Sequence, residues 1–414
     1  MIEMTKDPTI GTRCGDADLS RRAYLKGAVG LAAVGAAALL PGGTRAAESA
    51  IPAGTTPSAK PRFAYVGCRT TKERNARGEG IGVYQVDAST GAWAPVQLLK
   101  DLVNPSFLAF DPTQRFLYTV HGDQGEVSSF AINDRTGELT LLNTASSGGK
   151  NPVHLTTDPS GRFLIVANYA TGGVATLAIG ADGKLGDIVD LVPLAGTPGP
   201  HKVEQASSHP HQVAYDPTRD VLAVPDKGLD AVFTFRLDAE KGKLVPAGAG
   251  SVTARSTSGP RHIAFGPSGT HAYVVNELDS TVTTYAYDAS AASLKPLQIL
   301  STLPATFTGE NRAGGIVMAP SGRFLHATNR GHNHVAIFGV DPRTGLLQSA
   351  GWEPTRGKMP RFITLDPSAR FLYAANETTD TIVGFQVDAA TGALTALEPA
   401  VQTGSPVCVV FKTA

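Results

Sequence analysis

Residues 259–277, GPRHIAFGPSGTHAYVVNE, decide how the rest of the chain is interpreted. Two apolar runs flank a Gly-Pro-Ser-Gly turn at residues 266–269, which is the pattern of an antiparallel β-hairpin. Arg261 and His262 open the first run, and an Asn-Glu pair ending at Glu277 closes the second. Because the two free ends of a hairpin lie side by side, an arginine, a histidine and a carboxylate are predicted to share one edge.

The same hairpin recurs along the chain without gaps. Its turn prolines lie 47 to 58 residues apart, a period typical of four-stranded propeller blades. The prolines that mark these six hairpins are Pro112, Pro159, Pro217, Pro267, Pro320 and Pro367.

A second turn, rich in Asp and Gly, recurs seven times between these hairpins, from residues 87–91 to 388–392. The seventh hairpin is split between the ends of the chain. Residues 406–411 resemble its first strand, and residues 63–67 resemble its second. We therefore predict an all-β fold, a seven-bladed β-propeller of four-stranded antiparallel blades, closed by pairing of the N- and C-terminal strands in one blade. An open sandwich of many strands would not explain why the two leftover halves match.

Strand polarity then predicts which face of the propeller carries function. The first strand of each blade begins, and the second ends, on the face with the long connections at residues 69–80, 193–210 and 303–314. Long irregular loops on a rigid scaffold are where binding sites usually lie. We expect the polar strand ends to surround the mouth of the central channel on this face.

The first 61 residues are predicted to lie outside the propeller. Residues 20–26, SRRAYLK, precede a mildly apolar run at residues 27–40, which is too short to span a bilayer. We interpret residues 1–47 as a removable twin-arginine export signal, residues 48–61 as a flexible lead-in and residues 62–414 as the propeller domain. The mature protein is then expected in the periplasm or outside the cell, as a monomer without membrane contact.

Composition and cysteine content set two further bounds. Basic and acidic side chains balance at 36 each, so nothing favours an electrostatic nucleic-acid binder. Cys68 and Cys408 fall on adjoining strands of the closing blade, and the sequence leaves open a disulfide or two small core residues.

For several candidate side chains at the mouth, the sequence allows a purely structural role in place of a functional one. His154 and His262 either cap strand ends or contact a substrate. Asn329 belongs to a series of asparagines at strand ends that are expected mainly to satisfy backbone groups. His209-Pro-His211 alone is weak support for a metal site, and we expect neither metal nor cofactor. Arg361 adds a third guanidinium to the channel, which requires carboxylates or an anionic ligand nearby.

Four motifs together resemble the seven-bladed propeller lactonase family, which includes bacterial 6-phosphogluconolactonase and the fungal carboxymuconate cycloisomerase. They are His-Pro-His211, Gly-Pro-Arg261-His262, Asn276-Glu277-Leu278 and Asn329-Arg330, and the resemblance covers residues 62–412. It implies that His211, Arg261, Glu277 and Arg330 line a catalytic mouth. The expected export departs from a cytosolic pentose-phosphate enzyme and leaves open whether the substrate is phosphorylated.

The residues fit lactone hydrolysis on chemical grounds as well. Either Glu277 or His211 would activate water, while Arg261 and Arg330 would stabilise the oxyanion. The substrate, a sugar-type lactone or sugar acid, is expected to contact His154, His262, Arg361 and Asn329. The sequence has no Gly-x-Ser-x-Gly elbow for a covalent acyl-enzyme. Two alternatives stay open: a carboxymuconate-type cycloisomerase, and a non-enzymatic propeller that binds a ligand or a protein.

Overall fold

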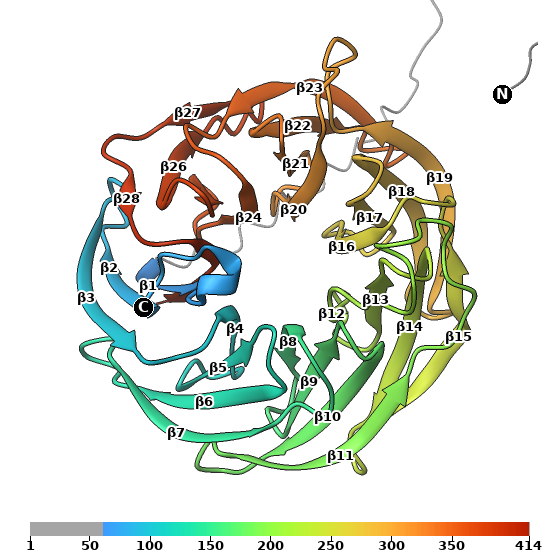
Figure 1. The fold of residues 1–414 in the computed structure, drawn as a ribbon. Coiled ribbons are helices and arrows are strands. Elements are labelled where there is room, and N and C mark those ends of the chain that lie inside the picture. Colours follow the sequence, from blue (N-terminus) through green and yellow to red (C-terminus); the bar gives the residue numbers. More distant parts are fainter. Residues whose placement is uncertain (1–60, 414) are drawn as a thin grey trace, which may run out of the picture. The chain divides into compact units, whose positions relative to one another are not determined.

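The computed structural model describes residues 61–413, which form a ring of seven antiparallel sheets around a central axis (Figure 1). We number these blades 1 to 7 along the chain. The ring confirms the predicted seven-bladed propeller. The predicted export signal, and all but the last residue of the predicted lead-in, lie outside the described residues. In the described part the helical content is one 3-10 turn, η1 (Lys72–Arg74).

The innermost strand of each blade opens at the mouth and lines the axis. Six of these strands follow the previous blade along the chain, whereas blade 1 takes its own from the C-terminus. In blade order they are β29 (Pro406–Thr413), β4 (Pro105–Phe110), β8 (Pro152–Thr157), β12 (Ala214–Tyr215), β16 (Pro260–Phe265), β20 (Arg312–Met318) and β24 (Pro360–Leu365).

The second strands are almost wholly buried, because each is covered on both faces by the neighbouring blades. Their sequences are accordingly near-continuous apolar runs rather than alternating ones. They are β1 (Pro61–Cys68), β5 (Phe116–His121), β9 (Phe163–Asn168), β13 (Leu222–Asp226), β17 (His271–Asn276), β21 (Phe324–Arg330) and β25 (Phe371–Asn376).

The third strands are also largely buried. They are β2 (Gly80–Val86), β6 (Glu126–Ile132), β10 (Gly173–Ile179), β14 (Ala231–Asp238), β18 (Thr281–Asp288), β22 (His334–Val340) and β26 (Thr381–Val387).

The fourth strands form the outer wall and are mostly exposed or half-buried. In blade 7 this strand is in two pieces, both paired with β26. The outer strands are β3 (Trp93–Lys100), β7 (Leu139–Ser146), β11 (Leu185–Pro193), β15 (Lys243–Thr253), β19 (Ser293–Ser301), β23 (Leu347–Pro354), and β27 (Leu394–Ala396) with β28 (Val401–Gln402).

Blade 1 closes the ring as predicted, since β29 pairs with β1 and places Ala64 opposite Phe411 and Gly67 opposite Cys408. The two cysteines lie in this pairing, but both are buried free thiols. Cys68 donates a hydrogen bond to the carbonyl of Gly80 instead. Of the two possibilities that the sequence left open, the structure therefore has core thiols, and closure depends on strand pairing and packing.

A repeated hydrogen bond ties neighbouring blades together at the face opposite the mouth. A second-strand side chain donates to a glycine carbonyl in the Asp/Gly turn of the next blade, as Tyr118 does to Gly183 and Tyr273 to Gly345. These glycines adopt positive φ, 81° at Gly183 and 67° at Gly345, which explains why the turns carry glycine. Three other blades make the same bond, and their donor–acceptor pairs are Tyr65–Gly137, His326–Gly392 and Tyr373–Gly91.

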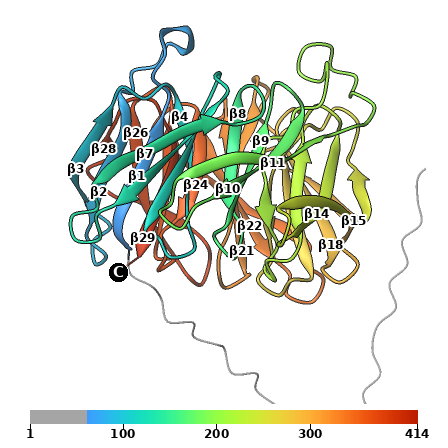
Figure 2. The same cartoon turned by 90° about the horizontal axis from the view of Figure 1, so that it is seen from below.

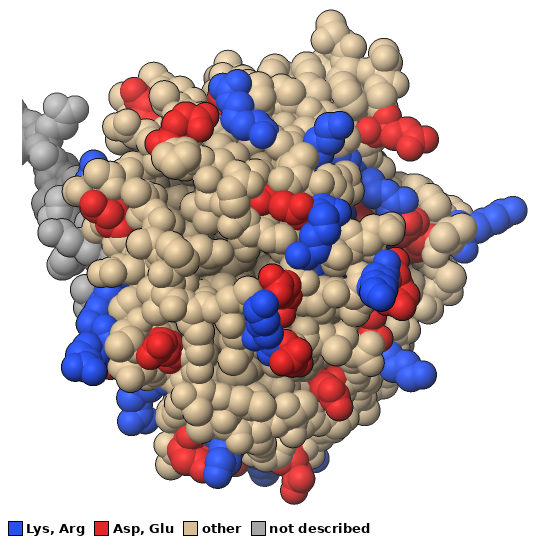
Figure 3. Space-filling model, turned by 60° about the vertical axis from the view of Figure 1, so that its left-hand side comes forward, with Lys and Arg blue, Asp and Glu red and all other residues tan. Residues whose placement is uncertain are grey.

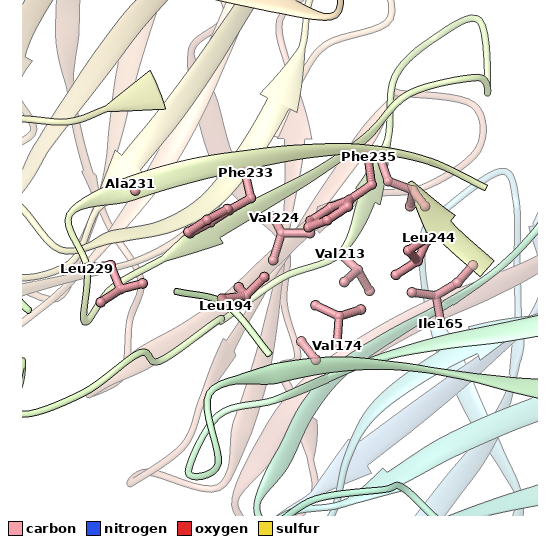
Figure 4. Close-up of a cluster of buried hydrophobic side chains, with 12 residues drawn as sticks. Ile165, Val174, Leu194, Val213, Val224, Leu229, Ala231, Phe233, Phe235 and Leu244 are labelled. Atoms are coloured by element: carbon pink, nitrogen blue, oxygen red, sulfur yellow. The ribbon is translucent and has the colours of Figure 1, made fainter. Parts of the chain in front are cut away.

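Apolar clusters fill the spaces between adjacent blades. Between blades 3 and 4, Ile165 and Val174 of one sheet pack against Val224, Phe233 and Phe235 of the other (Figure 4). Burying a side chain of this size contributes about 1.5–3 kcal/mol. Because every blade packs on two neighbours in this way, the ring is rigid enough to hold side chains at its mouth.

The long loops predicted on one face are found there. The segments between β1 and β2 (blue) and between β11 and β12 (green) project from the same side of the ring (Figure 2). On the outer wall that Figure 3 shows, acidic and basic side chains are interspersed. Within residues 61–413, no helix has the length and apolarity that a membrane crossing requires.

Candidate active site at the mouth of the channel

His211, Arg261, Glu277 and Arg330, which are far apart in sequence, come together at the mouth. Arg261 lies at the start of β16, Arg330 ends β21, and Glu277 directly follows β17. A cavity of about 240 Å³, which we call the mouth cavity, opens here. It is lined by Arg69, Arg74, Asn151, Val153, Tyr169, Glu204, His211, Lys227, Glu277, Arg312, Arg330 and Arg361.

A smaller hollow of about 10 Å³, the inner recess, lies beside the mouth cavity. Its polar lining is Arg69, Ser106, His211, Arg261, His262 and Arg361. His211, Arg69 and Arg361 belong to both linings, so the two spaces adjoin each other.

Glu277 is the centre of the ion-pair network. Its Oε2 lies 3.0 Å from Arg261 Nε and 3.0 Å from Arg330 Nη2. Its Oε1 lies 3.1 Å from Lys227 Nζ and 3.6 Å from Arg312 Nη1. One carboxylate thus compensates several cations, and Glu277, Arg261, Arg330 and Lys227 are all buried.

A second carboxylate reaches the network from a loop. Glu204, between β11 and β12, lies 2.6 Å from Lys227 Nζ and 2.6 Å from Arg312 Nη1. The side-chain amide of Gln205 also donates to the carbonyl of Lys227, which fixes the loop against blade 4. The loop therefore supplies part of the wall of the site and part of its charge balance.

The surroundings keep the Glu277 carboxyl ionised. Burial by itself raises its pKa, but the charges of Arg330, Lys227 and Arg261 hold the pKa well below the usual range. For Arg261, burial and the charge of Arg330 lower the pKa. A carboxylate held this strongly by cations is a poor proton acceptor, so Glu277 is better suited to orienting the guanidinium groups than to activating water.

His211 differs from Glu277 in its contacts rather than in the direction of its pKa shift. It is buried, and burial together with the charge of Arg261 lowers its pKa well below 6.5, so the imidazole is neutral at pH 7. Its Nδ1 has no hydrogen-bond partner within the described chain. The ring packs edge-on against Tyr169 and His262, with centroids 5.7 and 5.3 Å away. A neutral, oriented imidazole lining a cavity has the properties of a general base.

A break in the inner strand of blade 4 places His211. Pro210 has no N–H and makes only an isolated bridge with Asp226. His211 then bonds through its backbone to the carbonyl of Pro225, and the short strand β12 begins three residues later. Asp226 fixes the approach to this segment by accepting hydrogen bonds from Ser208 and the backbone of His209.

The other predicted site residues divide into two groups. His262 and Arg361 line the inner recess, and His262 lies 3.3 Å from Arg261 Nη1. His154 and Asn329 line neither space. His154 is buried against the ring of Phe107, and burial lowers its pKa to about 3. Asn329 is fully buried and bonds to Thr302 and Asn311, the structural role that the sequence favoured.

Sequence reasoning missed several residues of the mouth. Lys227 was recognisable, because it occupies the same repeat position, ten residues after the turn proline, as Glu277 and Arg330. Arg69 was recognisable as well, since it follows Tyr65 of the split hairpin as Glu277 follows Tyr273. Glu204 lies in a long loop that has no repeat partner, so the pattern carried no signal for it.

The histidine pair at residues 209 and 211 does not converge on a metal. His209 stacks on Tyr169, with centroids 4.5 Å apart, and its Nδ1 contacts the carbonyl of that residue. Among residues 61–413 no group of three or more His, Cys, Asp or Glu side chains has the geometry to hold a metal ion.

A larger hollow of about 570 Å³ lies between the outer strands of blades 1 and 7. Its charged side chains are engaged with partners, since Arg77 pairs with Asp380 and Glu79 pairs with Lys100. The ionisable groups that converge and whose pKa values are strongly shifted lie at the mouth. The mouth is therefore the candidate active site.

The fold and site together define a seven-bladed propeller with a buried, positively charged polar cluster at one end of its axis. Residues 63–411 match the family model "Lactonase, 7-bladed beta-propeller", and the chain belongs to this family.

Named relatives and solved structures show the same relationship. The 6-phosphogluconolactonase of Bacillus subtilis is 34% identical over 349 residues, which cover 84% of this chain and 97% of that protein. The 6-phosphogluconolactonase of Formosa agariphila is 32% identical over 73% of this chain and 86% of its own length. The structure of the Pseudomonas aeruginosa periplasmic gluconolactonase PpgL superposes with a TM-score of 0.77 at 32% identity, covering 85% of this chain and 99% of that one.

Proposed function

We propose that this protein hydrolyses a sugar-type lactone at the mouth cavity, with His211 activating water and the guanidinium groups of Arg261 and Arg330 stabilising the oxyanion. The observation that carries the proposal is the contrast between a neutral imidazole and an ionised, cation-bound carboxylate in one cavity. Both pKa values are lowered, so the distinction lies in the contacts: Nδ1 of His211 has no partner within residues 61–413, whereas both carboxylate oxygens of Glu277 are held by cations. Of the two candidate bases, His211 is favoured over Glu277.

The steps follow from the roles of these groups. His211 takes a proton from water, and the resulting hydroxide adds to the lactone carbonyl carbon. Negative charge develops on the carbonyl oxygen, where Arg330 can donate from Nε, a buried N–H without a partner within residues 61–413. The ring C–O bond then breaks, the alkoxide takes the proton from the His211 imidazolium, and a hydroxy acid leaves.

Glu277 has a positioning role in this scheme. Without a carboxylate between them, Arg261 and Arg330 would repel each other in a buried space. By binding both through Oε2, Glu277 fixes the directions of their remaining N–H groups. The same ion pairs make its own basicity low.

A lactone panel tests the proposal directly. Full-length protein is incubated with glucono-δ-lactone, its 6-phosphate and aliphatic lactones, and acid release is followed above the spontaneous rate. We expect acceleration for the sugar lactones. Absence of hydrolysis for every lactone, with retained binding of sugar acids, would instead support the non-enzymatic alternative.

The cycloisomerase alternative shares this mouth and needs its own assay. Muconate-type diacids absorb in the ultraviolet and lose that absorbance when a lactone ring closes. We expect no change in absorbance with this protein, and a catalysed loss would favour the alternative.

We further propose that the chain acts outside the cytoplasm. The support is the twin-arginine pattern at residues 20–26 and the periplasmic gluconolactonase among the similar structures. Fractionation of cells that carry either the wild-type chain or Arg21→Lys with Arg22→Lys tests export. We expect the substitutions to retain the protein in the cytoplasm, and unchanged distribution would contradict the proposal.

A further inference from the structure

The proposed base lacks a hydrogen bond of the kind that often orients a catalytic histidine. Such a residue is commonly held by a bond from one ring nitrogen to a carboxylate or a backbone carbonyl. The Nδ1 of His211 is buried and has no hydrogen-bond partner within residues 61–413. Packing against neighbouring side chains therefore has to set the direction of this imidazole.

The strand beside His211 gives it little support. β12 has two residues, whereas the other six inner strands have six to eight. Ahead of β12, Pro210 makes an isolated bridge, and the backbone N–H of His211 donates to the carbonyl of Pro225. The proposed base thus lies beside the shortest inner strand of the ring, where contacts from other blades contribute more to its placement.

Tyr169, which directly follows β9 in blade 3, contacts both histidines of the His-Pro-His segment. Its ring meets that of His211 at 81° with centroids 5.7 Å apart, and it lies nearly parallel to the ring of His209 at 4.5 Å. His209 Nδ1 also donates to the Tyr169 carbonyl over 2.9 Å. Edge-to-face and stacked contacts are the favoured geometries of aromatic pairs, so this one residue holds the segment at two points.

Further contacts hold Tyr169 itself and the far side of the imidazole. The backbone N–H of Tyr169 donates to the carbonyl of Asn151, 3.1 Å away, and Lys227 Nζ lies 5.5 Å from the centre of its ring. A cation at that distance is attracted to the ring. From blade 5, His262 meets the His211 ring at 66° and 5.3 Å. The imidazole is thus held between rings from the two blades that flank blade 4.

We propose that Tyr169 is a positioning residue, whose ring holds the His-Pro-His segment so that the His211 imidazole faces the mouth cavity, which both residues line. His209 acts through Tyr169 as the outer ring of the stack, a role that needs no metal. The inference rests on the proposed lactone hydrolysis, in which His211 is the base. It assigns the effect to the aromatic ring of Tyr169 rather than to its hydroxyl.

Replacing the ring tests the inference. On the full-length chain, kcat and KM are measured separately for the best lactone of the panel in wild type, Tyr169→Ala and Tyr169→Phe. We expect Tyr169→Ala to lower kcat by about tenfold or more while KM changes by less than about threefold, because a displaced base slows the reaction without removing a substrate contact. Tyr169→Phe keeps the ring and should recover kcat to within about threefold of wild type. Equal losses in both variants would overturn the inference, since the hydroxyl would then be responsible.

Tyr215→Ala is the matched control. Tyr215 lies on β12, beyond His211 on the same segment, is half-buried and lines neither the mouth cavity nor the inner recess. Its replacement should lower the free energy of unfolding but leave kcat within about threefold of wild type. Circular dichroism and denaturant unfolding confirm that each variant is folded. An equal loss of kcat in Tyr215→Ala would mean general loosening of blade 4 and would contradict a specific role for Tyr169.

His209→Ala provides a second variant if Tyr169→Ala does not fold. It removes the outer ring of the stack and the bond to the Tyr169 carbonyl, so kcat should fall, by a smaller factor than in Tyr169→Ala. Where both fold, the double variant should lose little more than Tyr169→Ala alone, because the two residues act through one chain of contacts. Independent, multiplicative losses would contradict the proposed stack.

A titration of His211 separates failure of this inference from failure of the proposed function. Isotope labelling of histidine follows the imidazole signals by NMR, and His211→Asn identifies the signal that belongs to His211. Burial is the main cause of the lowered His211 pKa, and the charged and titratable groups that face the ring are Arg261, Glu277, Arg361, Lys227 and His262. Tyr169→Ala leaves these groups in place but admits water, so the His211 pKa should rise toward 6.5. Tyr169→Phe and Tyr215→Ala should keep the wild-type titration.

The two measurements give distinguishable outcomes. A raised His211 pKa in Tyr169→Ala, in a protein that hydrolyses no lactone, supports the positioning of His211 and counts against the proposed function alone. An unchanged His211 titration in folded Tyr169→Ala, or a kcat within about threefold of wild type in an active enzyme, overturns the positioning role and leaves the lactonase proposal intact.

Discussion

At the scale of single residues, Glu277 shows how a charge can be essential without being the reacting group. It is buried and binds Arg261, Arg330 and Lys227, so its removal leaves three buried cations without their shared counter-ion. Its ionised state is a consequence of these contacts.

Glu277→Gln should therefore lower both stability and turnover. Breaking a buried ion-pair network by removing one partner costs about 3 kcal/mol or more, and misdirected guanidinium groups should reduce kcat at least about tenfold. Denaturant unfolding and lactone hydrolysis measure the two effects. The control is Glu79→Gln, whose partner Lys100 is exposed, and its unfolding midpoint should not move. Unchanged turnover in Glu277→Gln would remove this residue from the mechanism.

The pKa of His211 makes a separate prediction about pH. Because the folded-state pKa lies well below 6.5, the imidazole stays neutral as pH falls through that value, and it loses its function as a base only when it is protonated at lower pH. We expect kcat/KM to be flat between about pH 6.5 and 8 and to decline only well below pH 6.5. An acid limb centred at or above pH 6.5 would point to a different base.

At the scale of elements, a hydrogen bond from five of the seven second strands to the next blade gives the Asp/Gly turns there a structural role. Sequence periodicity revealed these turns but not what they contact. The bond requires a tyrosine or histidine at one repeat position and a glycine carbonyl in the adjacent blade. Blade 3 carries Ile165 there, and blade 4 carries Ala223, so only part of the ring uses the device.

Comparing two Tyr→Phe substitutions measures how much this inter-blade hydrogen bond contributes to stability. Tyr273→Phe removes the 2.9 Å hydrogen bond to Gly345 and leaves a buried carbonyl unpaired, which should destabilise the protein by about 1–3 kcal/mol. Tyr285→Phe is the control, since its buried hydroxyl has no partner within residues 61–413. That change should be neutral or stabilising. Equal losses in the two variants would show that the inter-blade bond does not contribute.

The element scale also shows where prediction from sequence ends. The strands, the closing pair β1–β29 and the placing of Arg261 and Glu277 follow from a repeat with a fixed period, so position in the repeat gives position in the ring. Glu204 lies in a loop that occurs once, and its approach to the mouth depends on tertiary contacts. The decision between His211 and Glu277 as base depended on burial and neighbouring charges, which the sequence does not contain.

At the scale of the whole molecule, the ring closes without a covalent link. Ala64 to Val66 pair in continuous register with Val409 to Phe411, and the two nearby cysteines remain thiols. Burial raises the pKa of Cys68 to about 11 and that of Cys408 to about 12, so both are protonated and unreactive at pH 7.

Thiol titration of unreduced protein tests this description of closure. In a Cys14→Ser background, denatured protein should show two free thiols, the folded protein should react slowly, and reductant should not shift the unfolding midpoint. Absence of free thiols, together with destabilisation by reductant, would mean that a disulfide closes the ring.

The central claim is that the propeller brings His211 together with the Glu277-anchored arginines to open a lactone. The most direct test is kcat/KM for the best lactone of the panel in wild type and in His211→Asn, with both proteins shown to be folded. Loss of a general base predicts a decrease of about 100-fold or more. A His211→Asn protein that retains kcat/KM within about threefold of wild type, well short of what loss of a general base costs, would contradict the account.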